Sequence, residues 1–280
     1  MTLAAPPELV ERRRGMAAAL AKGMWRTDPP AQDAVLGGVR VLHFRPAKPA
    51  RGVILHLHGG AFRIGCPETV GPYAVALAER CAVEVVCPAY RLAPEHPFPA
   101  GLGDARAVLQ ALKAESDLPL ILSGDSAGGN LAAALAAEQR VAGLVLLSAW
   151  LDLTVTSPSY AANAATDPLF SREAAEEASA LYLQGARAEQ PSASPLLGPV
   201  DGFPPTLVSV GLGEVLAEDG LRFHAALQAA GVPARLCAIA GMEHTAVVRG
   251  LDKPGSPETF EAVAAFVDEV VSKPRRRPRT

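Results

Sequence analysis

A serine flanked by glycines stands where a predicted strand gives way to a predicted helix. Residues 124–129 read GDSAGG and fit the pattern Gly-x-Ser-x-Gly, with an apolar run before them and an alanine-rich run after them. In such a turn the glycines relieve crowding, and the serine hydroxyl is held off the sheet, where it can attack an acyl carbon. The alternative is a plain turn or an anion site built from the same glycines. Ser126 is therefore the candidate nucleophile.

A second glycine pair follows another predicted strand, in the sequence HGGAF at residues 58–62. Small residues in a turn let backbone N–H groups approach a substrate oxygen closely. We expect the N–H groups of Gly60 and Ala61, together with that of Ala127, to stabilise a negatively charged oxygen during acyl transfer. Gly59 of the same motif is a further candidate. A flexible turn without a chemical role is the alternative.

A serine nucleophile needs a base, and the chain has six histidines to supply it: His43, His56, His58, His96, His224 and His244. If the members of a triad follow the order serine, acid, histidine along the chain, the base lies near the C-terminus. His244 comes after the last predicted strand, on a loop, whereas His43 and His56 lie in predicted strands and His224 in a predicted helix. We expect His244 to be the base, with a pKa near or somewhat below about 6.5.

The acid that orients the histidine is expected after the penultimate strand, where two carboxylates are available. Glu214 lies where that strand gives way to a loop, and Asp219 lies at least one helical turn later. Glu214 is favoured because a loop at the end of the strand can reach His244. For each of them the alternative is a surface carboxylate near a helix N-terminus.

The elements that must position these residues alternate between short apolar runs and longer alanine- and leucine-rich runs. Continuous apolar runs are typical of strands covered on both faces. The strand candidates are Val39–Phe44, Gly52–Leu57, Val83–Pro88, Pro119–Ser123, Gly143–Ser148, Thr206–Val210 and Ala234–Ala238, and the helix candidates between and after them are Thr69–Cys81, Gly103–Ala114, Ser126–Gln139, Glu218–Ala230 and Pro257–Val271. This alternation predicts an α/β fold with a mainly parallel central sheet flanked by helices, with chemistry at the carboxyl ends of the strands.

Two segments do not follow the alternation, and both could cover the strand ends as a cap. Residues 7–38 contain a charged helix candidate at Glu8–Met24, and residues 153–200 contain one at Ser171–Gln184, which Ser171 could cap. Ordinary surface decoration is the alternative. The length of 280 residues suits one domain over residues 1–280.

Composition limits the class of partner and the location. A net charge of −3 argues against nucleic acid, and the basic run at residues 273–279 is interpreted as a solvated tail. The four cysteines show neither CxxC nor zinc-ligand spacing, so we expect free thiols and no metal. The N-terminus does not resemble a signal peptide, and no apolar run is long enough for a membrane span. A cytoplasmic location is expected.

Several motifs together resemble the hormone-sensitive-lipase family of α/β-hydrolases, a group of mostly bacterial carboxylesterases. They are HGGAF at 58–62, YRLAPEHPFPA at 90–100, GDSAGG at 124–129, SAWLDLT at 148–154, VGLGEVL at 210–216 and GMEH at 241–244. The resemblance implies the α/β-hydrolase fold, a small helical cap matching residues 7–38 and 153–200, and frequent homodimers. It also implies hydrolysis of short- to medium-chain acyl esters. Ala61 replaces a glycine usual in the family but keeps its N–H group.

These observations predict a serine carboxylesterase. Ser126, His244 and Glu214 would form and then hydrolyse an acyl-enzyme, and neither a metal nor an organic cofactor is needed for such a reaction. The same machinery could instead serve a lactonase, an amidase or a formamidase. A ligand-binding relative without turnover is a further alternative, against which the presence of both Ser126 and His244 argues.

Overall fold

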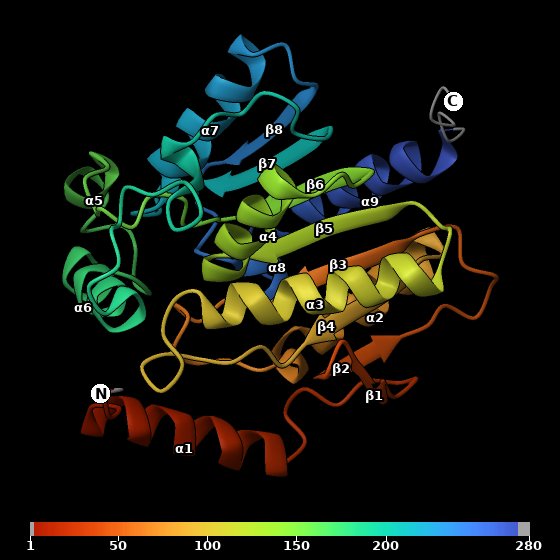
Figure 1. Cartoon of the computed structure of the whole chain (residues 1–280), viewed down its shortest axis with the longest axis horizontal. Helices are drawn as coiled ribbons and strands as arrows, with labels where there is room; N and C mark the ends of the chain where they lie inside the picture. The colour runs from red at the N-terminus through yellow and green to blue at the C-terminus, as the bar shows by residue number, and fades with distance from the viewer. Residues whose placement is uncertain (1–2, 274–280) are drawn as a thin grey trace.

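An eight-stranded sheet is the middle layer of the described chain, and the predicted α/β architecture is confirmed (Figure 1). The computed structural model describes residues 3–273, so the basic tail beyond Lys273 lies outside the described residues. The strands are β1 (Gln32–Leu36), β2 (Val39–Phe44), β3 (Val53–Leu57), β4 (Glu84–Pro88), β5 (Leu120–Asp125), β6 (Gly143–Leu147), β7 (Thr206–Gly211) and β8 (Ala234–Ile239). They are ordered β1-β2-β4-β3-β5-β6-β7-β8 across the sheet.

Most of this sheet is parallel, as the sequence predicts. The neighbours from β4 across to β8 run parallel, whereas β1 pairs with β2 and β2 with β4 in antiparallel register. Strands β3, β5, β6 and β7 are buried at every position, because helices cover both faces of the sheet. This burial explains why their sequences are continuous apolar runs.

Two hydrophobic cores fill the space between the sheet and its helices, one on each face (Figure 1). The first core contains side chains of α3 (Ala100–Glu115), α4 (Ala127–Glu138) and α7 (Ala217–Ala229). The second contains side chains of α2 (Gly71–Cys81), α8 (Ala246–Arg249) and α9 (Ser256–Ser272). A 3-10 helix, η1 (Pro67–Val70), precedes α2, where the sequence predicts one continuous helix. The sheet is therefore packed between two helical layers.

The two segments outside the predicted alternation contain four helices and one strand. Helix α1 (Pro7–Ala21) comes from the first segment, and α5 (Ser159–Ala162), α6 (Arg172–Leu183) and the 3-10 helix η2 (Pro195–Leu197) come from the second. Ser171 caps α6 as predicted, because its Oγ accepts the Ala174 N–H at 3.2 Å. Strand β1 was not predicted, and it places the end of residues 7–38 in the sheet rather than above it.

No helix within residues 3–273 is both long enough and apolar enough to cross a membrane.

Candidate active site

Ser126 lies in a strained turn between β5 and α4, as its motif predicts. Its φ of +51° and ψ of −120° are costly for any residue with a side chain. The turn is held by the Ser126 N–H, which donates to the Leu147 carbonyl at 2.9 Å. A Cβ atom on Gly124 would collide with the Gly128 carbonyl, and one on Gly128 would collide with the Leu57 carbonyl. Both glycines are therefore required by close backbone packing.

The structure brings Ser126, His244 and Glu214 into one hydrogen-bonded chain. His244 Nε2 lies 3.0 Å from Ser126 Oγ, and His244 Nδ1 lies 2.8 Å from Glu214 Oε2. The three residues follow β5, β7 and β8, so they meet at the carboxyl edge of the parallel sheet. Glu214 is 1% exposed, so water does not compete for its carboxylate. This arrangement can pass a proton from the serine hydroxyl to the imidazole.

The second oxygen of the Glu214 carboxylate is held by two donors. Oε1 accepts the Gly211 N–H at 2.6 Å and the Ser148 hydroxyl at 2.8 Å. Ser148 Oγ in turn accepts the N–H of Thr245, the neighbour of His244, at 3.1 Å. Ser148 thus joins the loops that carry the acid and the histidine. Sequence reasoning missed it, although its position at the carboxyl end of β6 was a signal.

Asp219, the other candidate acid, is placed elsewhere. One of its oxygens accepts the N–H groups of Leu151 and Asp152 at 2.9 and 3.0 Å, and the other accepts the Ser157 hydroxyl. Burial raises the pKa of Asp219 to about 7, while these hydrogen bonds oppose the rise. The residue ties α7 to the loop after β6, and in the described part of the chain it makes no hydrogen bond to His244. Its contacts indicate a role in holding the fold.

Opposing effects act on the pKa of His244. Burial lowers it, but the hydrogen bond and the charge of Glu214 raise it, and the resulting pKa lies above the ordinary histidine value. The expectation of a pKa near or below that value is therefore corrected. The Phe170 ring stacks over the imidazole, with 6.1 Å between the two ring centroids, and lies on one side of the site. The site stabilises the charged imidazolium.

The glycine-rich loop after β3 presents two backbone N–H groups beside the serine. Within the described residues, the N–H groups of Gly60, Ala61 and Ala127 donate no hydrogen bond, so they are free to donate to a ligand oxygen. Gly59 differs, because its N–H donates to Asp125 Oδ1 at 3.0 Å. The structure thus commits Gly59 to the protein and excludes it as a free donor.

A cavity of about 160 Å³ opens onto these groups. It is lined by Arg12, Gly60, Ala61, Arg63, Ile64, Asp125, Ser126, Leu169, Phe170, Ala174, His244 and Thr245. The lining includes residues from both segments outside the predicted alternation. The cavity is small, since pockets for drug-sized ligands span about 300–1,000 Å³.

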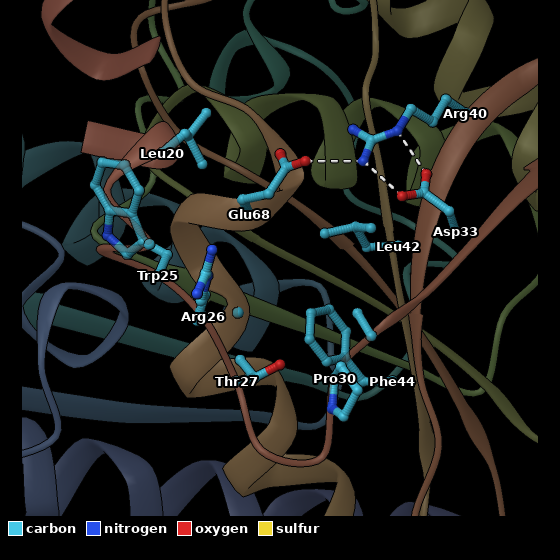
Figure 2. A pocket seen from close by; sticks show the side chains of 13 residues that line it. Leu20, Trp25, Arg26, Thr27, Pro30, Asp33, Arg40, Leu42, Phe44 and Glu68 are labelled. Carbon is cyan, nitrogen blue, oxygen red and sulfur yellow. Dashed lines mark hydrogen bonds and ion pairs between the residues drawn. The ribbon is translucent and has the colours of Figure 1, made fainter. Parts of the chain in front are cut away.

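A larger cavity of about 350 Å³ lies near the C-terminal end of α1, and none of the triad candidates lines it (Figure 2). Arg26 and Arg40 both line it, and Arg40 is held between Asp33 and Glu68 at 2.6 and 2.8 Å. These ion pairs engage the Arg40 guanidinium, and among its lining residues there is no nucleophile beside a base. In residues 3–273, no group of three or more His, Cys, Asp or Glu is arranged to hold a metal ion.

Comparison with known proteins agrees with the fold. A family model described as the alpha/beta hydrolase fold matches residues 54–248. An esterase of Acinetobacter venetianus is 39% identical over 240 residues, which cover 82% of this chain and 79% of that protein. The carboxylesterase NlhH of Mycobacterium tuberculosis is 33% identical over 232 residues, with 76% and 72% covered.

Solved structures agree closely in shape. An esterase from the bacterial hormone-sensitive lipase family superposes with a TM-score of 0.85 at 32% identity, covering 96% of this chain and all of that one. The hormone-sensitive-lipase homologue EstE7, from a metagenome library, superposes with a TM-score of 0.88 at 30% identity, covering 94% and 93%. The similarity therefore extends over nearly the whole described chain, including both segments outside the predicted alternation.

Proposed function

Because the chain belongs to the hormone-sensitive-lipase family of α/β-hydrolases, we propose that it is a carboxylic ester hydrolase with a serine-histidine-glutamate triad. The observation that carries the proposal is the hydrogen-bonded chain from Ser126 through His244 to Glu214, next to three N–H groups that donate no hydrogen bond in the described part of the chain. The family's named esterases support the substrate class. The geometry supports the assignment of roles.

In the proposed reaction, His244 accepts the hydroxyl proton of Ser126 as Oγ attacks the ester carbonyl carbon. The carbonyl oxygen becomes negative and accepts hydrogen bonds from the N–H groups of Gly60, Ala61 and Ala127. The imidazolium, stabilised by Glu214, then protonates the leaving alcohol. Water deprotonated by His244 attacks the acyl-enzyme through the same steps and releases the acid. No step requires a metal or an organic cofactor.

We further propose that residues 7–38 and 153–200 supply a small helical cap over this site. Arg12 of α1 lines the cavity from the first segment, and Leu169, Phe170 and Ala174 line it from the second. The cap stays close to the acid as well, because Asn163 Nδ2 donates to the Glu214 carbonyl at 2.7 Å. A cap that contacts the cavity and the acid loop limits the space for substrate.

We propose a preference for short- to medium-chain acyl groups, which the small cavity volume supports. The test is kcat/KM for 4-nitrophenyl esters from acetate to palmitate, with lactones and amides of matched size measured alongside. A maximum at two to six acyl carbons is expected. A maximum at long chains in micelles would indicate a lipase, and faster turnover of lactones or amides would change the bond assigned. The cytoplasmic location and the homodimer stay predictions.

A further inference from the structure

The loop that carries the proposed oxyanion donors has an unfavourable backbone. Gly60, Ala61 and Phe62 have φ values of +114°, +52° and +60° in succession. Left-handed backbone is unfavourable for a residue with a side chain, so Ala61 and Phe62 need support from elsewhere. If that support weakens, the N–H groups can turn away from Ser126. The surroundings of the loop therefore bear on catalysis.

Arg13 of α1 reaches the end of this loop with its whole guanidinium group. Its Nε donates to the Arg63 carbonyl at 2.9 Å, and its Nη2 donates to the Ala93 carbonyl at 2.7 Å. Nη1 and Nη2 also bind both oxygens of Glu95, at 2.7 and 3.1 Å. The planar guanidinium group of arginine suits such a set of acceptors. The two carbonyl groups that it binds, those of Arg63 and Ala93, belong to different loops.

These two loops are also bonded to each other at the strained residues. The Ala93 N–H donates to the Phe62 carbonyl at 2.9 Å, while its own carbonyl accepts from Arg13. The peptide groups around Phe62, Arg63 and Ala93 thus form one connected set with the guanidinium. Glu95 fixes the plane of that guanidinium. A shift of Arg13 would be transmitted directly to the turn that contains Ala61.

Helix α1 has few other attachments to the molecule. The structure describes every residue of α1, and Leu9 is the only one of them that is buried. Cavities of about 450 and 350 Å³ lie along the helix, and Leu20 borders both. Figure 2 shows the smaller of the two. In Figure 1 the helix lies outside the layers around the sheet. Because its apolar packing is slight, the Arg13 contacts are a principal link between α1 and the site.

We propose that Arg13 is a positioning residue that holds the oxyanion loop in its active conformation. The inference rests on the proposed function, since it assigns the loop a part in the reaction. Arg13 does not itself line the substrate cavity, and it acts through the backbone of Arg63, which it binds directly, and of Phe62, which it reaches through Ala93. It follows that the first cap helix affects the rate of chemistry in addition to covering the site.

The test is steady-state kinetics of Arg13→Ala with 4-nitrophenyl butyrate, with kcat expressed per site that reacts with a fluorophosphonate probe. Loss of one oxyanion donor costs about 100- to 1,000-fold in kcat, so loss of a support for the donors should cost about 10- to 100-fold. KM should change by less than threefold. Arg13→Lys keeps the positive charge but not the planar guanidinium group, and should recover part of the lost kcat. Arg14→Ala is the matched control, because within residues 3–273 Arg14 makes only an exposed 3.6 Å ion pair with Glu11.

Several results would overturn the inference. One is a kcat per reactive site within threefold of wild type in Arg13→Ala. Another is a fall only in the fraction of reactive sites, which would assign Arg13 to folding alone. An equal loss in Arg14→Ala would show a general effect of charge on α1. If wild type neither hydrolyses the ester nor reacts with the probe, the proposed function fails, and the inference fails with it.

Discussion

Replacing Glu214 by glutamine tests the proposed triad most directly, because the change preserves the shape of the side chain and removes its charge. The Oε1 position faces two donors, the Gly211 N–H at 2.6 Å and the Ser148 hydroxyl at 2.8 Å. The amide oxygen of a glutamine should take this position. Its NH2 group would then occupy the other position, 2.8 Å from His244 Nδ1, and donate to that nitrogen.

As a consequence, the imidazole of His244 is held in the wrong tautomer. With Nδ1 accepting, the neutral imidazole carries its proton on Nε2, which faces Ser126 Oγ at 3.0 Å and can no longer accept the serine proton. The imidazolium also loses its negative partner. A matching exchange in a serine protease costs about ten-thousand-fold, which is about 5 kcal/mol of transition-state stabilisation. We expect a loss of that order in kcat/KM for 4-nitrophenyl butyrate in Glu214→Gln.

Asp219→Asn is the matched control. An asparagine there can keep its oxygen towards the N–H groups of Leu151 and Asp152, and it can donate its NH2 group to Ser157 Oγ. The kcat/KM of Asp219→Asn should therefore stay within about tenfold of wild type, which is a much smaller loss than replacement of a triad member causes. Thermal melts of both variants check the fold. If Asp219→Asn loses orders of magnitude while Glu214→Gln stays near wild type, the acid is misassigned.

Three further outcomes are expected. Ser126→Ala should lose about a million-fold in kcat with an unchanged thermal midpoint, and more than a few per cent residual activity would exclude Ser126 as nucleophile. Because the pKa of His244 is raised and its neutral form is the base, kcat/KM should rise with pH through an apparent pKa above about 6.5. A flat profile from acid to neutral pH would contradict this base. Ser148→Ala removes one hydrogen bond of about 1 kcal/mol from Glu214 and should lower kcat/KM about fivefold, whereas unchanged kinetics would exclude Ser148 from orienting the acid.

Strands β3, β5, β6 and β7 could be predicted because strands buried on both faces have continuous apolar sequences. Strand β1 could not, since its five residues QDAVL include a single buried position and it pairs on one side alone. An edge strand of that kind has no distinctive period. The 3-10 helix before α2 was missed for a similar reason, because Pro67 at a helix start fits either type of helix.

The contact between Ser126, His244 and Glu214 followed from chain order, because each comes after a strand that ends at the same edge of the sheet. The distinction between Gly59 and Gly60 did not follow. It depends on the Asp125 carboxylate, which binds the Gly59 N–H from another strand. Pairings between segments far apart in sequence leave no local pattern. For the same reason the hydrogen bond from Arg13 to Arg63 could not be predicted.

Backbone strain shows which parts of such a site a sequence can indicate. Of the eight described non-glycine residues with positive φ, five lie in the loops of the site: Ala61, Phe62, Ser126, Ser148 and Thr245. Strain of this kind gathers where function constrains the backbone and persists only with support from packed surroundings. Around Ser126 and Ala61 that support includes glycines, which are visible as motifs. At Ser148 and Thr245 it comes from hydrogen bonds with distant residues, the Ser209 carbonyl among them, and it becomes visible only once the chain is folded.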